Sequence, residues 1–157
     1  MNIGMIIYSQ TGHTLTVGQK ILKKLEEVGH SANLEQVTIV GDAGPGARDI
    51  PFDNLPAVDD YDAIIFGSPV QAFSLATPMT AYMNQLPSLQ GKRVACFVTK
   101  QLPFHWTGGN RAIRTMKRIC EARGATICAT EIVVWSRSRR EKSMLQCVDR
   151  LGNLFPG

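Results

Sequence analysis

The chain lacks the features that mark a membrane protein, a metal protein or a disulfide-linked protein. None of its apolar runs approaches the ~20 residues that a membrane-spanning helix needs. Its cysteines form no C-x-x-C pair and lie within strand or helix patterns, which argues against a disulfide framework, a zinc site and an iron–sulfur cluster. We therefore expect buried, reduced thiols at Cys96, Cys120, Cys128 and Cys147.

The N-terminus has no basic segment followed by a small-residue cleavage site, so no secretory signal peptide is expected. The composition that is present, 44% apolar and 19% charged over 157 residues, is ordinary for a soluble globular protein. We expect a single domain over residues 1–157, with no membrane segment and a cytoplasmic location.

Apolar residues alternate between strand and helix periods along the chain, and no segment repeats. Strands are predicted at 3–8, 32–37, 62–67, 94–99 and 127–135, and helices at 17–28, from Pro78 through 86, from a cap at Asn110 to near 124, and at 144–154. The connection 41–60 is predicted to hold at most a short helix near 52–55. This order predicts an α/β fold with three layers, in which helices cover both faces of a doubly wound sheet of five parallel strands, order 2-1-3-4-5.

Residues 9–14, Ser-Gln-Thr-Gly-His-Thr, connect the first strand to the first helix. A helix N-terminus leaves backbone N–H groups unpaired, and its dipole favours an anion. Ser9, Thr11 and Thr14 can add hydroxyl donors, while Gly12 allows a tight turn. Because neither G-x-G-x-x-G nor G-x-x-x-x-G-K-[ST] occurs, a single phosphate fits better than a pyrophosphate. The alternative is that these residues only cap the helix.

In a doubly wound sheet, ligands bind beyond the carboxyl ends of the strands, where the loops 9–14, 68–77 and 100–109 are expected to meet. The second and third of these loops are rich in apolar and aromatic side chains. Exposed loops of that kind usually cover a ligand, and a phosphate site beside them suits a phosphorylated planar heterocycle. The alternative is that Phe73 and Trp106 pack into the core.

These features resemble the flavodoxin family over essentially the whole chain. The resemblance is carried by residues 7–14, by Tyr-Asp-Ala-Ile-Ile-Phe-Gly-Ser-Pro at 61–69, and by 97–99 leading to Thr-Gly-Gly at 107–109. It implies that flavin mononucleotide (FMN) is the cofactor, with its phosphate at 9–14 and its isoalloxazine ring bordered by 69–73 and 100–106. The candidate FMN-binding residues are Ser9, Gln10, Thr11, Gly12, His13, Thr14, Ser68, Pro69, Val70, Gln71, Ala72, Phe73, Thr99, Lys100, Gln101, Phe104, His105 and Trp106.

The resemblance implies an electron carrier between redox partners. The segment 61–69 is also similar to flavodoxin-like NAD(P)H:quinone oxidoreductases, although the chain lacks the extra segments that such enzymes usually carry. An NAD(P)H- or quinone-dependent oxidoreductase is therefore one alternative, and a flavin-free interaction module is another. No catalytic residue or metal ligand is assigned, since neither His13 nor His105 has a suitably spaced carboxylate or cysteine. Gln71 could hydrogen-bond the flavin edge.

The charge is polarised along the chain. Residues 1–62 hold 4 basic and 9 acidic residues, and residues 63–157 hold 13 basic and 4 acidic ones, so that the two parts carry −5 and +9. Electron-carrier flavodoxins are typically acidic around the flavin, and this chain departs from that pattern. The basic residues at 111–123 form either a solvated helix face or a docking surface for an acidic redox partner. No recognition motif points to nucleic acid, and both a monomer and a homodimer remain open.

Overall fold

The structure is a computed structural model that describes residues 1–102, 104 and 107–156. Its central sheet has five parallel strands in the order β2-β1-β5-β7-β8. They are β1 (Asn2–Ile7), β2 (Ser31–Gln36), β5 (Ala63–Gln71), β7 (Arg93–Lys100) and β8 (Thr126–Val134). A short strand, β6 (Ser74–Leu75), pairs antiparallel with the end of β5. The α/β sheet and its predicted strand order are confirmed.

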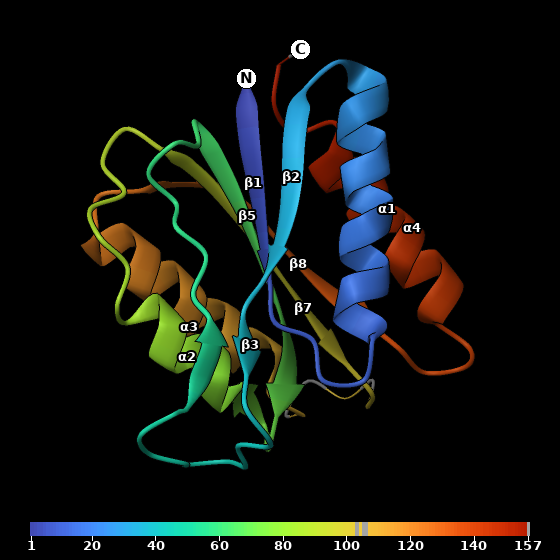
Figure 1. Ribbon diagram of the computed structural model, residues 1–157. Coiled ribbons are helices and arrows are strands. Elements are labelled where there is room, and N and C mark those ends of the chain that lie inside the picture. Colours follow the sequence, from blue (N-terminus) through green and yellow to red (C-terminus); the bar gives the residue numbers. More distant parts are fainter. Residues whose placement is uncertain (103, 105–106, 157) are drawn as a thin grey trace.

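Two helices cover each face of the sheet (Figure 1). The helices α1 (His13–Val28) and α4 (Arg140–Gly152) lie on one face, and α2 (Thr77–Met83) and α3 (Gly109–Ala122) lie on the other. Alternate residues of the strands point to opposite faces, so the sheet divides two cores. Ile64 and Phe66 pack with the α2 and α3 side, while Ala63 and Ile65 pack with the α1 and α4 side. This explains the uninterrupted apolar run of β5.

Tyr61, which precedes β5, links this central strand to β1 and β2. Its ring lies against the backbone of Gly4, where an added Cβ would come within 2.3 Å of the ring. Its hydroxyl donates a hydrogen bond of 2.5 Å to Glu35 in β2. Burial, and then the hydrogen bond to Glu35, raise the pKa of Tyr61 to about 12. The neutral phenol is therefore the form that the folded protein stabilises.

The prediction of a short helix near 52–55 is wrong. This segment forms strand β4 (Phe52–Asn54), which pairs antiparallel with β3 (Thr38–Ile39). Asn54 donates its side-chain amide to the carbonyl of Gln36 at 2.6 Å, and Phe52 packs against the core on the α2 side. These are contacts between distant parts of the chain, which override local preference.

All four helices begin before their predicted starts, and α1 and α4 do so by four residues, at His13 and Arg140 instead of 17 and 144. The helix α2 begins at Thr77, so Pro78 is its second residue, and it ends at Met83, before the predicted residue 86. Pro87 disfavours helical geometry at Leu86 and limits how far the helix can extend. The helix α3 is capped by Gly108, with φ 98° and no side-chain cap, so that Asn110 lies inside its first turn.

Three of the cysteine predictions hold in the described residues. Cys96, Cys120 and Cys147 are buried free thiols, whereas Cys128 is partly exposed, so its predicted burial is wrong. Within residues 1–102, 104 and 107–156, no helix has the length and apolar character to cross a bilayer. The same residues bring no three His, Cys, Asp or Glu side chains together in a way that could hold a metal ion.

Candidate functional site

The loops after β1, β5 and β7 meet at the carboxyl-terminal edge of the sheet, as the strand order predicts. Figure 1 shows β5 and β7 pointing toward the edge where α1 begins. The hydroxyls of Thr14 and Thr99 are 2.8 Å apart and join the start of α1 to the end of β7. Gln101 and the Nδ1 atom of His13 are 3.0 Å apart and form a second link. The first and third predicted ligand loops are therefore in direct contact.

The first loop leaves backbone donors free at the positive end of α1. The Ser9 hydroxyl accepts the amides of Gly12 at 3.2 Å and Leu15 at 3.3 Å, so this side chain orders the loop from within. The amides of Thr11, His13 and Thr14 donate to no acceptor among the described residues. Since α1 also has no acidic residue in its first turn, this end of the helix suits an anion.

The three hydroxyls of this loop have different surroundings. Thr14 is only 1% exposed, and its hydroxyl is bound to Thr99, so it positions the loop instead of facing solvent. Ser9 still has its own hydroxyl hydrogen to donate, because it serves as the acceptor in both bonds described above. Thr11 and Gln10 are exposed, and at Gly12, with φ 92°, an added Cβ would meet nothing within 4 Å. The mouth of the loop is open.

The second loop is a tight hairpin between β5 and β6. Val70 pairs with Leu75 and Gln71 with Ser74, which leaves Ala72 and Phe73 as the two turn residues. Both have positive φ, 47° and 64°, in a turn that usually contains asparagine or glycine. Phe73 is 51% exposed, so the alternative that it packs into the core is wrong. The hairpin holds this aromatic side chain at the edge of the sheet.

The side chain of Gln71 anchors the hairpin from behind. Its amide donates to the carbonyl of Ala43 at 3.2 Å, and its oxygen accepts the backbone amide of Thr77 at 3.0 Å. These bonds occupy the groups that we expected to reach a flavin edge. Ser68 is fully buried, and its hydroxyl donates to the carbonyl of Pro69. Both residues shape the loop in the described structure.

Lys100 organises the third loop. Its ammonium group donates to the carbonyl of Phe104 at 2.8 Å and to the hydroxyl of Thr107 at 3.1 Å. Burial, and then the positive charge of Arg139, lower the pKa of Lys100. Leu102 and Phe104 are 47% and 52% exposed. The predicted site residues His105 and Trp106 lie outside the described residues.

A hollow of about 140 Å³ lies between the hairpin and the third loop, with Val70 and Phe73 on one side and Leu102 and Thr107 on the other. This volume is below the roughly 300–1,000 Å³ of typical ligand pockets, so a planar ring placed here would be only partly enclosed. Phe73, Leu102 and Phe104 supply three of the exposed large apolar side chains of the described residues. Such a concentration at one edge favours a binding surface.

Sequence reasoning missed an aromatic stack beside the first loop. The rings of His13 and Trp135 are stacked, with centroids 4.3 Å apart and planes 13° apart. The guanidinium of Arg140 lies 5.6 Å from the centroid of Trp135. Trp135 is also held by its amide, which donates to the carbonyl of Lys100 at 2.7 Å. The sequence did hold a signal for this stack, because Trp135 is an aromatic residue directly after the last strand, at the same edge of the sheet as the loops.

No family model matches the chain. The curated protein "Protoplast secreted protein 2" of Saccharomyces cerevisiae is 26% identical over 123 residues, a match that covers 70% of this chain and 60% of that protein. The chain thus spans about 60% of the length of the curated relative that it matches.

Solved flavodoxins share the architecture at low sequence identity. A flavodoxin from the domain Archaea is 18% identical, with a TM-score of 0.70 over 97% of this chain and 94% of that one. A variant of Fusobacterium nucleatum flavodoxin, bound to flavin mononucleotide, is 13% identical, with a TM-score of 0.66 over 96% and 92% of the two chains. The protein has a flavodoxin-like fold, as the resemblance implied.

Proposed function

We propose that the protein binds FMN and carries electrons between redox partners. The observation that carries this proposal is the set of amides at Thr11, His13 and Thr14, which donate to no described residue, at the positive end of a helix and beside loops with exposed aromatic side chains. The flavin phosphate would accept these amides, because charge-assisted hydrogen bonds at a helix N-terminus are strong. The fold supports the proposal, since a Fusobacterium nucleatum flavodoxin with this architecture binds FMN.

The residues of this edge fit such a ligand. The open loop at Gly12 leaves room for a phosphate, and Phe73 and Phe104 offer apolar surface to a flat ring. When bound, FMN supplies the electron-transfer chemistry, and the protein supplies binding, orientation and electrostatics. Lys100 and Gln71 hold the two ring-binding loops in shape, and Thr14 and Thr99 fix the phosphate loop to the sheet. The remaining candidate residues of these three loops belong to the same proposal.

The site is tested by placing a carboxylate against the phosphate. Thr11 is exposed and lies outside every helix, so Thr11→Asp should fold normally but lose FMN binding through charge repulsion. Thr126 is exposed at the start of β8, at the edge of the sheet opposite the candidate site. Thr126→Asp is therefore the matched control and should bind FMN as the wild type does. Equal FMN affinities in the wild type and the Thr11 variant would overturn the phosphate site, and so would the extraction of FAD in place of FMN.

The proposed carrier role includes a protein redox partner and a cytoplasmic location. It is tested by mixing the flavin-loaded protein with NADH or NADPH and a quinone. A carrier should turn over negligibly without a second protein. Rapid turnover by the protein alone would favour the oxidoreductase alternative, and a protein that binds no flavin would favour the interaction module.

A further inference from the structure

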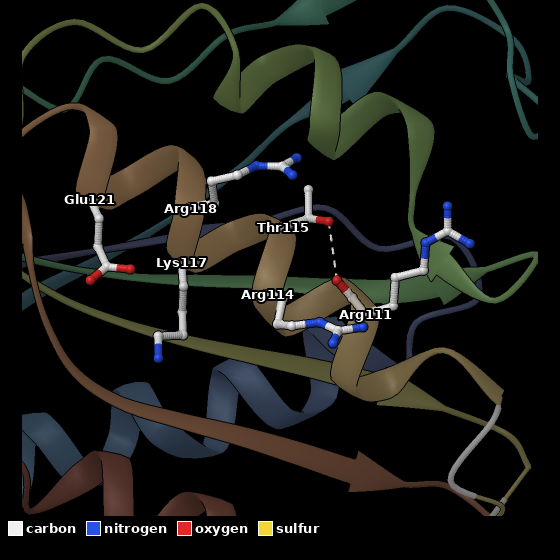
Figure 2. Close-up of a pocket in the computed structure, with 6 residues that line it drawn as sticks. All are labelled: Arg111, Arg114, Thr115, Lys117, Arg118 and Glu121. Carbon is white, nitrogen blue, oxygen red and sulfur yellow. Dashed lines mark hydrogen bonds between the residues drawn. The ribbon is translucent and has the colours of Figure 1, made fainter.

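The outer face of α3 carries four cations, Arg111, Arg114, Lys117 and Arg118, which we call the α3 basic face. Figure 2 shows these side chains extending from α3. Together with Thr115 and Glu121 they line a hollow of about 700 Å³. The three arginines are exposed, and Lys117 is half-buried. Glu121 is the one carboxylate that lines the hollow. The basic face therefore has a net charge of +3 once Glu121 is included.

These cations have no ion-pair partner among the described residues, where the one salt bridge joins Arg150 to Glu131. Like charges three and four residues apart on a helix repel one another. The helix dipole adds to this cost, because α3 has no acidic residue in its first turn and Arg111 stands near its positive end. The arrangement opposes the stability of the helix, so it is better explained by an anionic partner outside the chain.

The α3 basic face begins at the proposed flavin site. Gly108, which caps α3, is packed so tightly against the hairpin that an added Cβ would lie 2.3 Å from the carbonyl carbon of Phe73. Arg111 follows Gly108 by three residues and lies within the first turn of the helix. The hairpin that carries the exposed side chain of Phe73 thus packs against the cap of α3, three residues before Arg111. An apolar centre with a charged rim is typical of protein interfaces.

In the other helical layer, α1 carries mixed charge, while α4 and the turn before it carry a second basic cluster, Arg137, Arg139, Arg140 and Lys142, with Glu141 among them. On α1, Lys20, Lys23 and Lys24 are accompanied by Glu26 and Glu27, so the two signs are mixed. Figure 1 shows α1 on the opposite side of the sheet from α3. The charge of α1 therefore does not compete with the α3 basic face for an acidic partner.

We propose that the α3 basic face docks an acidic redox protein and so brings its redox centre to the exposed edge of the flavin site. This inference rests on the proposed function. Complementary charge raises association rates by about 10- to 1,000-fold at low salt and loses its effect as salt screens it. A protein fits better than a nucleic acid, because α3 contains no aromatic side chain on which bases could stack. In the electron-transfer step, the partner loses one electron and the flavin gains it.

The test uses a reduced, acidic [2Fe–2S] ferredoxin as the probe and measures the rate at which it reduces the FMN-loaded protein. The variant Arg111→Glu/Arg114→Glu should react at least tenfold more slowly than the wild type at low salt and at a similar rate in high salt. The control Lys20→Glu/Lys23→Glu changes the net charge equally, with the same spacing on an exposed helix face, and should stay within twofold of the wild type. Both variants should keep their FMN content and their rate of reduction by dithionite.

A second readout, equilibrium binding of fluorescently labelled ferredoxin to the protein with and without FMN, separates the two proposals. A protein that contains no flavin but binds ferredoxin through the α3 basic face would refute the proposed function and support the docking surface. Equal rates in the wild type and the α3 variant, or equal slowing in the control, would overturn the docking surface. Tighter binding of a single-stranded RNA oligomer than of ferredoxin at the same salt, lost in the α3 variant, would also overturn it in favour of nucleic acid.

Discussion

At Gly108, the absence of a Cβ atom allows α3 to pack directly against the hairpin of the candidate site. It caps α3 with φ 98° and ψ 0°, and an added Cβ would lie 2.3–2.4 Å from three backbone atoms of Phe73. Gly108→Ala therefore introduces two costs. A left-handed backbone disfavours a side chain by about 1–2 kcal/mol, and a contact with rigid backbone adds the cost of overpacking, about 1–3 kcal/mol.

Gly29 provides a matched control for the first of these costs. It follows α1 with φ 105° and ψ 8°, nearly the geometry of Gly108, and an added Cβ there would meet nothing within 4 Å. Gly29→Ala should lose only the backbone part, about 1–2 kcal/mol. We expect Gly108→Ala to be less stable than Gly29→Ala by about 1–3 kcal/mol.

The assay is urea unfolding of both variants, together with their affinity for FMN. Typical domain stabilities are about 5–15 kcal/mol, so Gly29→Ala should stay folded, and Gly108→Ala should do so wherever the wild type lies above the low end of that range. Gly108→Ala should also weaken FMN binding, because the added methyl group displaces the hairpin that holds Phe73, whereas Gly29→Ala should not. Equal stability and equal FMN affinity in the two variants would refute the tight contact between α3 and the hairpin.

Three further predictions address single side chains. Phe73→Ala should weaken FMN binding by about 1–3 kcal/mol, the contribution of one aromatic stack. The Phe73 side chain is 51% exposed, which limits the loss of folding stability. Unchanged FMN affinity in a fluorescence titration would show that the ring does not contact the flavin. Lys100→Met should cost about 1–3 kcal/mol in urea unfolding, because the two hydrogen bonds of its charged ammonium group, to the carbonyl of Phe104 and the hydroxyl of Thr107, are lost. Wild-type stability would contradict that role. Tyr61 has a pKa of about 12 when folded against about 10 when unfolded, so its contribution is complete below pH 10 and is lost as the pH rises toward 12. The stability difference between wild type and Tyr61→Phe should accordingly shrink between pH 8 and pH 11, and a constant difference in urea unfolding would speak against the raised pKa.

The sheet and the meeting of its loops could be predicted from the sequence because both follow from regular patterns. The apolar run 63–66 requires a strand buried on both faces, and the order of strands and helices then determines which loops share an edge. The strand at Phe52–Asn54 could not be predicted in this way. It depends on contacts with Gln36 and with the core, which no local pattern in its own three residues encodes.

Within the site, residue types were easier to predict than their roles. The sequence marked Thr14 and Gln71 as candidate ligand contacts, but their side chains hold loops together through Thr99 and through Ala43 and Thr77. The stack of His13 on Trp135 joins the first helix to the segment after the last strand, which lie far apart in the sequence. Such pairings depend on side-chain direction in three dimensions, so composition and periodicity do not reveal them.

The central claim, that this edge of the sheet binds FMN through its phosphate, is tested most directly by titrating the flavin-free protein with FMN and with riboflavin, which lacks the phosphate. The amides of Thr11, His13 and Thr14 have no acceptor within the described part of the chain and can donate to a phosphate. Hydrogen bonds to a charged group contribute about 1.5–3 kcal/mol each. Two such bonds already correspond to more than 100-fold in affinity. We predict that FMN binds with one molecule per chain and at least 100-fold more tightly than riboflavin. Equal affinities, or no binding of either flavin, would contradict the account.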